Sequence, residues 1–150
     1  DADKALRYLK FNNFFGQELA FDIDSDNIKC SHQKEDNVCD KCLKNAFSYA
    51  KKMREELKKE FDKVSIIYSG RGFHLHVHDK KAFNLSFRER KLFNKKFKKY
   101  PIDSWVSAGR IRLIRMPFSL HGLVSRKVLP VKGNFFNEKD ALPAFLKHMI

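Results

Sequence analysis

Two aspartates, Asp22 and Asp24, stand two residues apart in the apolar run Leu19-Ala20-Phe21-Asp22-Ile23-Asp24. If this run is a β-strand, both carboxylates point to the same face of the sheet, because side chains alternate along a strand. Two such charges repel each other, so the pair is stable mainly when a positive charge lies between them. Mg²⁺ and Mn²⁺ prefer hard oxygen ligands and are the usual candidates. Taken alone, an Asp-x-Asp pair is more often a solvated strand end, since acidic residues are mostly surface residues.

A second candidate metal site contains all three cysteines of the chain and one histidine, in the order Cys30, His32, Cys39, Cys42. Three thiolates and one imidazole suit tetrahedral Zn²⁺, and four protein ligands close the site, so its role should be structural. Zinc would clamp an insertion at about residues 27–45, which has no core pattern of its own. The alternative is three separate thiols and a surface histidine. An odd number of clustered cysteines argues against a disulfide framework and indicates a reducing compartment.

A glycine-flanked arginine lies in the segment Ser69-Gly70-Arg71-Gly72, between two short apolar runs. The glycines permit a tight turn and a close approach to a ligand, and the forked guanidinium of Arg71 suits phosphate oxygens. On the following run, His74, His76 and His78 share one face. That face could bind a metal ion or phosphate, or it could be the polar outer face of an ordinary hairpin.

Basic residues are concentrated in two later stretches. Arg110, Arg112 and Arg115 alternate with aliphatic residues, which alone slightly favours a solvated basic face. The segment from Ser86 to Lys99 carries seven basic residues against one acid, Glu89, and its phenylalanines are expected in the core. We therefore interpret its basic face as a track for phosphate groups.

Hydrophobic periodicity and turn residues predict the elements that position these groups. In chain order they are a short helix at 3–11, a strand at 18–24, a helix at 43–61, two hairpin strands at 64–68 and 73–78, a helix from 86 to about 99, a strand at 127–131 and a helical tail from 138. Ser86 and Glu89 form a capping-box signature at the start of the second long helix. The expected fold class is α+β, with a mixed β-sheet core flanked by helices in a single domain spanning residues 1–150.

The bulk properties fit a globular protein with a polyanionic partner. The chain has 150 residues, about one domain, with 43% hydrophobic residues and a net charge of +13. If the charge is clustered, nucleic acid is the commonest partner, and a basic membrane-surface protein is the alternative. No apolar stretch approaches the roughly 18 residues that span a bilayer, and no signal peptide is evident. A Lys-containing Gly-rich loop is also absent, which argues against an ATPase.

Together these stretches resemble the small, catalytic subunit of the archaeo-eukaryotic DNA primases. Residues 21–24 resemble the first motif of that family, two metal-binding aspartates. Residues 69–74 resemble its second motif, which contacts the phosphates of the incoming nucleotide. Residues 115–122 resemble its third block, in which a basic residue and a histidine also bind the triphosphate. Asp103, twelve residues before Arg115, falls where the family places its third metal-binding aspartate.

The resemblance covers roughly residues 18–131, and the Cys/His set matches the zinc motif that the family carries between its first and second motifs. The segment between Arg71 and Asp103, which lie 32 positions apart, is shorter than the family's. The resemblance therefore implies a minimal or trimmed primase core of archaeal type, with an RRM-like catalytic half and an inserted zinc knuckle.

The activity that the resemblance implies is template-directed synthesis of short primers from NTPs or dNTPs on single-stranded DNA. Two Mg²⁺ or Mn²⁺ ions would be held by Asp22, Asp24 and Asp103. The nucleotide-binding residues would be Ser69, Arg71, His74, Arg115 and His121. A structural Zn²⁺ would be held by Cys30, His32, Cys39 and Cys42.

The implied partners are single-stranded DNA template and primer, nucleotides, and a primase large subunit or large-subunit domain with an Fe–S cluster, with no membrane. The location would be cytoplasmic and nucleoid-associated in an archaeon, or nuclear in a eukaryote. Two alternatives stay open: a repair-type polymerase of the same superfamily, and a non-catalytic zinc module that only binds nucleic acid.

Overall fold

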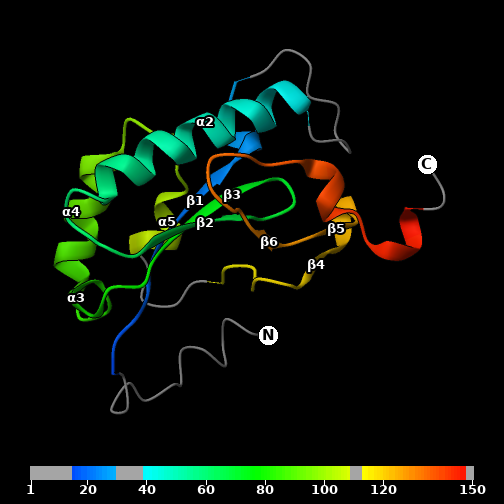
Figure 1. Cartoon of the computed structure of the whole chain (residues 1–150). Coiled ribbons are helices and arrows are strands. Elements are labelled where there is room, and N and C mark those ends of the chain that lie inside the picture. The colour runs from blue at the N-terminus through cyan, green and yellow to red at the C-terminus, as the bar shows by residue number, and fades with distance from the viewer. Residues whose placement is uncertain (1–14, 30–38, 109–112, 148–150) are drawn as a thin grey trace, which may run out of the picture.

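A computed structural model describes residues 15–29, 39–108 and 113–147 (Figure 1). Within them, a four-stranded sheet has the strand order β1-β3-β2-β6. Its strands are β1 (Leu19–Asp24), β2 (Val64–Tyr68), β3 (Gly72–Val77) and β6 (Leu129–Pro130). The other elements are helices α2 (Asp40–Leu57), α3 (Lys80–Phe83), α4 (Phe87–Phe97) and α5 (Ser104–Ala108), and the strand pair β4 (Leu120–His121) and β5 (Arg126–Lys127). The α+β class is thus confirmed.

All pairings in the four-stranded sheet are antiparallel, so the expectation of a mixed sheet is wrong for the described strands. The connection from β1 through α2 to β2 makes those two strands parallel to each other. Strand β3 lies between them, however, and pairs antiparallel with both. The finer expectation of an RRM-like half stays a prediction.

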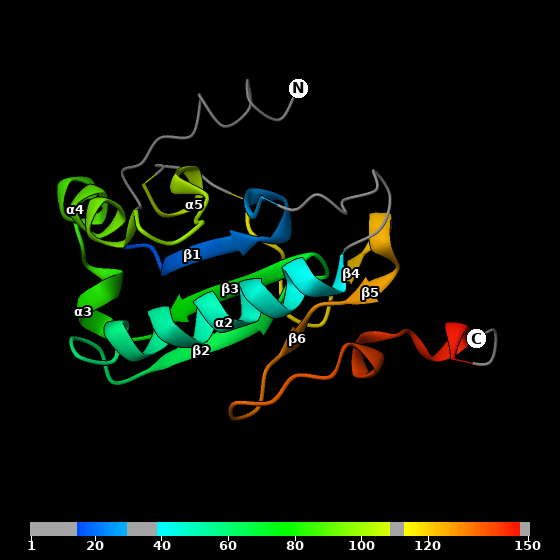
Figure 2. The ribbon, with the colours of Figure 1, turned by 90° about the horizontal axis from the view of Figure 1, so that it is seen from above.

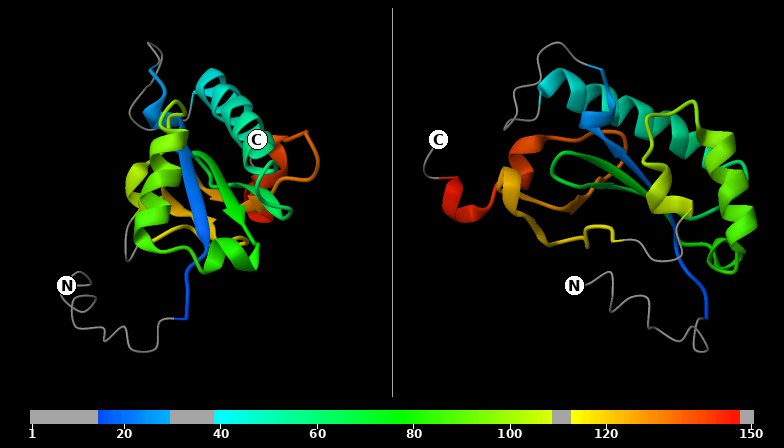
Figure 3. Two further views of the ribbon diagram at one scale, coloured as in Figure 1. Left: turned by 90° about the vertical axis from the view of Figure 1, so that its left-hand side faces the viewer. Right: turned by 180° about the vertical axis from the view of Figure 1, so that it is seen from behind.

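Helix α2 covers one face of the sheet, and the segment from residue 113 to β4 passes along the opposite face (Figures 1 and 2). Side chains on the covered face are apolar and buried, among them Phe21, Phe73 and Leu75, and they pack against the apolar stripe of α2. The opposite face carries polar groups, because the intervening residues of β1 and β3 point there. Helix α5 packs against both β1 and α4, at the edge of the sheet that β1 forms (Figure 3).

The local sequence signals account for most boundaries. The hairpin between β2 and β3 is confirmed, and Ser69 N–H donates to the Gly72 carbonyl at 3.0 Å to close it. The capping box is also confirmed: Glu89 N–H donates to Ser86 Oγ and Ser86 N–H donates to the Glu89 carboxylate. Helix α2 begins three residues before the predicted position and ends at Leu57, followed by a turn through residue 60.

Two predicted elements take a different form. The strand predicted at 127–131 is present as β5 and β6, because the chain pairs first with β4 and then with β2 as it passes buried Val128. The predicted helical tail consists of two 3₁₀ turns, Glu138–Ala141 and Ala144–Leu146, separated by Pro143, which cannot donate a helical hydrogen bond. The helix predicted at 3–11 lies outside the described residues. No helix among the described residues is long and apolar enough to cross a membrane.

Arg90 is a basic residue of the second long helix that does not lie on its exposed face, so it is not part of the predicted phosphate track. Its side chain is 1% exposed, on the same side of α4 as Phe97. Its guanidinium donates to five backbone carbonyls, those of Gln17, Glu18, Ala82, Phe83 and Leu85. Arg90 therefore ties the entry to β1 to the turn that follows α3.

We expect Arg90→Met to lower the stability of the fold by about 3 kcal/mol, since five partly or fully buried carbonyls lose a charged donor. For a domain of this size the melting temperature should fall by roughly 6–12 °C. Arg88→Met is the matched control, because Arg88 is an exposed arginine two residues earlier in the same helix, and it should change the free energy of unfolding by less than about 0.5 kcal/mol. Equal melting temperatures for the two variants would contradict the structural role of Arg90.

Candidate active site

The carboxylates of Asp22 and Asp24 lie on the face of the sheet opposite α2. Both aspartates are half-buried. Phe21 and Ile23, the residues before and after Asp22, are fully buried on the α2 face. In the register with β3, Asp22 lies opposite His74 and Asp24 lies opposite Gly72. The predicted same-face arrangement therefore follows from the strand itself.

Gly72 permits the close approach of β3 to β1 at this point. A Cβ atom at Gly72 would lie 2.2 Å from the Ile23 carbonyl oxygen and 2.8 Å from Asp24 Cα. Such distances are far below van der Waals contact, so any side chain would push the two strands apart. Gly72 therefore sets how closely the glycine loop approaches the acidic pair.

Asp103 lies next to Asp22, although 81 positions separate them in the chain. The Asp103 N–H donates to the Asp22 carbonyl at 2.8 Å. Asp103 Oδ1 accepts from the Trp105 N–H at 2.8 Å and so caps the first turn of α5. The charge of Asp103 also contributes to the raised pKa of Asp22, which places its carboxylate in the same electrostatic environment.

The surroundings disfavour negative charge on the pair. Burial first, and then the charges of Asp24 and Asp103, raise the pKa of Asp22 from 3.8 to about 7, against the opposing effect of Arg115. Burial also raises the pKa of Asp24, while the charges of Arg71, Arg115 and His121 lower it. The pair is therefore a place where a cation would be favoured.

The glycine loop is ordered by its own hydrogen bonds. Ser69 Oγ accepts from the Gly72 N–H at 3.1 Å, and the Tyr68 hydroxyl donates to the Gly70 carbonyl at 2.7 Å. Gly70 has φ = 103°, a left-handed conformation that favours glycine. Arg71 is half-buried and forms an ion pair with Asp26, which follows the acidic strand. Its guanidinium is thus held beside the aspartates.

His121 packs directly on the glycine loop. A Cβ atom at Gly70 would lie 2.7 Å from His121 Cβ and 2.8 Å from His121 Cδ2. His121 is 2% exposed, and its pKa is lowered by burial and by the positive charges of Arg115 and Arg71. The segment that begins at residue 113 therefore returns to the loop and brings two further basic groups to it.

His74 lies in the buried centre of this face. Its Nε2 is 3.6 Å from Asp22 Oδ1, beyond hydrogen-bond distance, and its Nδ1 has no hydrogen-bond partner among the described residues. Burial, followed by the nearby charges of His76, Arg115 and His121, lowers the pKa of His74 to about 3. The ring is therefore neutral and able to donate one hydrogen bond.

The other two histidines of β3 lie farther along the strand. His76 is 5% exposed, and its Nδ1 is 2.8 Å from Glu18 Oε1. His78 is exposed and its Nε2 is 2.7 Å from Ser65 Oγ. The interpretation of this surface as the polar outer face of an ordinary hairpin is therefore wrong for His74 and His76. Both side chains are buried, and the segment after residue 113 passes along that face.

The donor set fits a hard divalent cation. Asp22 Oδ1 is buried and has no hydrogen-bond partner among the described residues, so an acceptor is available at the centre of the acidic group. Carboxylate oxygens are the ligands that Mg²⁺ and Mn²⁺ prefer. Within 15–29, 39–108 and 113–147, however, no three His, Cys, Asp or Glu side chains are gathered closely enough to hold a metal ion as they stand. The structure brings the three aspartates to one region without closing them around one point.

Cys39 and Cys42 lie at the start of α2. Cys39 is the N-cap residue and Cys42 is buried in the first turn. The positive end of a helix lowers a thiol pKa and so favours a thiolate ligand. Cys30 and His32 lie outside the described residues, so the four-ligand zinc site stays a prediction.

Sequence analysis did not single out Asn94, which links α4 to the helix that follows Asp103. Asn94 Nδ2 donates to the Ser104 carbonyl at 2.8 Å, and Ser107 Oγ donates to Asn94 Oδ1. The available signal was its position in the helix: Asn94 is in phase with buried Arg90 and Phe97. A polar residue in that phase indicates a specific buried contact.

Comparisons with known proteins agree with this arrangement. Residues 21–101 match the family model described as DNA primase small subunit. The chain is 41% identical, over 148 residues, to an uncharacterized DNA primase small subunit-like protein of Archaeoglobus fulgidus, covering 89% of this chain and 53% of that protein. It is 39% identical over 74 residues to the DNA primase small subunit PriS of Pyrococcus furiosus, covering 45% of this chain and 20% of that protein.

A third relative, the DNA primase small subunit PriS of Thermococcus kodakarensis, is 33% identical over 79 residues, with 49% of this chain and 23% of that protein covered. The chain thus matches about half the length of the Archaeoglobus relative and about a fifth of each of the two PriS proteins. The family model includes the acidic pair and the glycine loop, which the structure places side by side. The chain belongs to the DNA primase small subunit family.

Proposed function

We propose that the chain is a primase catalytic core, which makes short primers on single-stranded DNA by metal-dependent nucleotidyl transfer. One observation carries the proposal: three segments distant in sequence converge on one face of the sheet. The Asp103 backbone is hydrogen-bonded to that of Asp22, Gly72 lies against Asp24, and His121 lies against Gly70. A surface that only binds nucleic acid has no need of this buried acidic group.

Asp22, Asp24 and Asp103 are the residues that would hold two Mg²⁺ or Mn²⁺ ions. When bound, such ions activate the attacking 3′-hydroxyl and stabilise the charge that develops at the α-phosphate. The chain's own contribution is to hold three carboxylates on a rigid strand and a capped helix start. Burial keeps water away from Asp22 Oδ1, which strengthens its interaction with a cation.

The triphosphate would bind Arg71, Arg115 and His121, with His74 and Ser69 as uncharged donors. Arginine forms charge-assisted, bidentate hydrogen bonds with phosphate oxygens. Neutral His74 would offer an N–H without adding charge beside Asp22. Arg71 is paired with Asp26, so nucleotide binding would exchange a carboxylate partner for a phosphate.

The remaining parts of the proposal concern structure and partners. Cys30, His32, Cys39 and Cys42 would hold a structural Zn²⁺ at the start of α2. The proposed partners are single-stranded DNA template and primer, nucleotides, and a large subunit that carries the Fe–S cluster, in the nucleoid of an archaeal cell. A repair-type polymerase would extend a primer but would not join two free nucleotides.

The assay that tests the proposal is formation of a dinucleotide from free nucleotides on a single-stranded template with Mn²⁺ or Mg²⁺. We expect Asp22→Asn and Asp24→Asn each to lower its rate by more than about 100-fold, because each removes a carboxylate that would hold the ions that stabilise the transferring group. Asp140→Asn, at an exposed carboxylate of a 3₁₀ turn, is the control and should retain the wild-type rate. Normal synthesis by the Asp22 or Asp24 variant would refute the metal assignment.

Gly70→Ala should weaken nucleotide binding by displacing His121. The new methyl group would overlap the imidazole, and alanine at φ = 103° adds about 1–2 kcal/mol of backbone strain. We expect at least a tenfold rise in the Kd for a nucleoside triphosphate, measured by calorimetry. In Gly122→Ala, one residue after His121, the new methyl group would meet no atom within 4 Å, so the Kd should be unchanged. If both variants bind alike, His121 is not part of the site.

Cys39→Ser and Cys42→Ser should each lose the bound zinc and lower the melting temperature, because a closed four-ligand site contributes directly to folding. Zinc is measured by elemental analysis of purified protein, and stability by thermal unfolding with and without a chelator. The chelator should destabilise the wild-type chain and leave both variants unchanged. Stoichiometric zinc in both variants would rule out the Cys₃His site.

A further inference from the structure

We propose that α4 and α5 form a binding surface for single-stranded nucleic acid, in which lysines and an arginine of α4 contact phosphates and Trp105 stacks on a base. This surface lies outside the aspartates and the glycine loop. It deepens the proposed function, on which it rests for the identity of the strand as the template. The binding itself requires no metal ion and no nucleotide.

Four exposed cations form one stripe on α4. They are Arg88, Lys91, Lys95 and Lys98, which are spaced three, four and three residues apart. Residues at this spacing are neighbours on a helix surface. None of the four forms an ion pair among the described residues. The stripe extends over ten residues, or about 15 Å, comparable to about four nucleotides at the 3.4 Å rise of a DNA strand.

The contacts of the helix show which flank carries this stripe. Lys96 and Lys99 pair with Glu60 and Glu56, so their side of the helix faces α2. Asn94 contacts the start of α5, on another side. Lys91 and Lys98 are three residues before and four residues after Asn94, so this edge of the stripe adjoins α5. The acid in this segment, Glu89, is held in the capping box at the helix start.

Trp105 is the single tryptophan of the chain, and it is 68% exposed on α5. Its backbone N–H donates to Asp103 Oδ1, so the indole projects two residues after a proposed metal ligand. A large exposed aromatic side chain on a helix that is otherwise packed against β1 and α4 indicates a binding surface. Figure 3 shows α5 between β1 and α4, on the same side of the molecule.

The combination of a cationic stripe and an exposed indole favours single-stranded nucleic acid as the ligand. Phosphates attract the cations of α4 electrostatically, and an exposed indole offers a stacking surface for an unpaired base of any sequence. An acidic protein would use the cations but would not require an exposed indole at the end of the stripe. A strand lying on α4 and stacked on Trp105 would be directed toward Asp103, which links the surface to the proposed catalytic centre.

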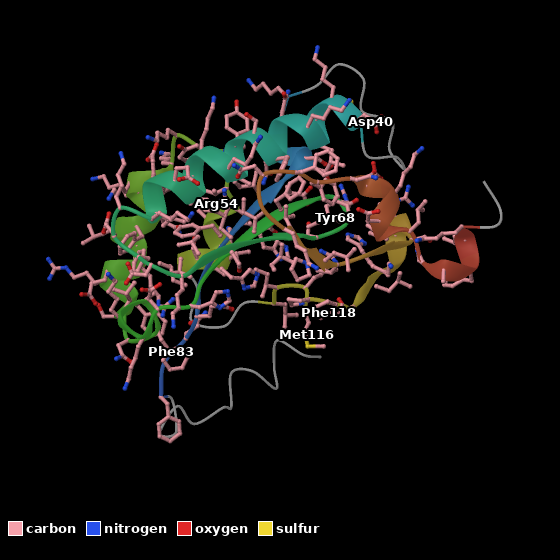
Figure 4. The ribbon with its side chains drawn as sticks, viewed as in Figure 1. Asp40, Arg54, Tyr68, Phe83, Met116 and Phe118 are labelled. Atoms are coloured by element: carbon pink, nitrogen blue, oxygen red, sulfur yellow. The ribbon has the colours of Figure 1, made fainter. Side chains whose placement is uncertain are left out.

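The exposed apolar side chains after residue 113 are a different surface. Met116 and Phe118 are 71% and 77% exposed and project from the segment under the sheet (Figure 4). They belong to the segment that carries Arg115 and His121 of the proposed nucleotide site, so they are not part of the surface on α4 and α5.

The test is titration of the full chain with a 15-nucleotide oligothymidylate, without divalent ions or nucleotides, followed by Trp105 fluorescence. Binding should quench the emission, because stacking places a base on the indole. Trp105→Ala should weaken binding by about 5- to 150-fold, measured by anisotropy of a labelled oligonucleotide, and Trp105→Phe should retain most of the affinity. Thermal unfolding confirms that both variants fold. An unchanged emission at saturating DNA would overturn the proposal.

The phosphate contacts are tested by replacing Lys91, Lys95 and Lys98 with Gln in one variant. Three lost contacts should reduce the slope of log Kd against log salt by about 2. The matched control replaces Lys44, Lys52 and Lys59, exposed lysines on or directly after α2, and should leave the slope unchanged. Equal effects of the two triple variants would mean diffuse attraction and no site. Displacement of the DNA by polyglutamate of equal charge would instead indicate an acidic protein partner and would also overturn the proposal.

Asp22→Asn separates this inference from the proposed function. It should bind the oligonucleotide like the wild-type chain while failing to form dinucleotides. Normal DNA binding by the Lys91, Lys95, Lys98 variant would overturn the surface and leave the proposed chemistry intact. Dinucleotide synthesis by Asp22→Asn would overturn the chemistry and leave the surface to be judged by its own binding data.

Discussion

The central constraint in this structure is that two half-buried carboxylates share one side of a strand, opposite the core, while the backbone of a third aspartate is hydrogen-bonded to that strand. A pKa of about 7 for Asp22, instead of 3.8, means that ionising it costs the folded chain roughly 4 kcal/mol more than the unfolded chain. Because the folded-state pKa is raised, this cost appears as the pH rises from about 4 to about 7. A divalent cation would offset it, and the same cation would draw together side chains that now lie apart.

The rest of the fold holds that charge in place. Helix α2 and the apolar face of the sheet form the core that keeps β1 and β3 rigid. On the other face, Gly72 lets β3 approach Asp24, and Gly70 lets His121 approach the loop. Arg71 and Arg115 supply the positive charge that partly offsets the repulsion between the aspartates. The glycines are therefore needed for contacts between segments, and only Gly70 is also required for its φ angle.

Sequence patterns succeeded where one local interaction decides the outcome. The strand at Asp22, the hairpin and the Ser86–Glu89 capping box each depend on neighbours within a few residues. Sequence patterns failed where contacts with distant segments decide whether a side chain is buried. Arg90 counted as one more surface cation, because two of its carbonyl partners, Gln17 and Glu18, are 73 and 72 residues away in the chain. The burial of His76 likewise depends on Glu18 and neighbouring strands, which its own alternation along β3 does not reveal.

The cations behind the net charge of +13 have different contacts and therefore different roles. Arg71 lies beside the aspartates, Arg90 is buried against carbonyls, and Lys96 pairs with Glu60 in the turn after α2. Arg71 belongs to the proposed nucleotide site, and Arg90 and Lys96 stabilise the fold, so these three cations are not counted toward a surface for a nucleic-acid strand. The cations of α4 that border α5 have no such partner among the described residues, and they lie on the helix that Asn94 joins to the segment after Asp103. A buried polar contact thus fixes where the remaining positive charge lies relative to the aspartates, and a strand attracted by that charge would be brought to them.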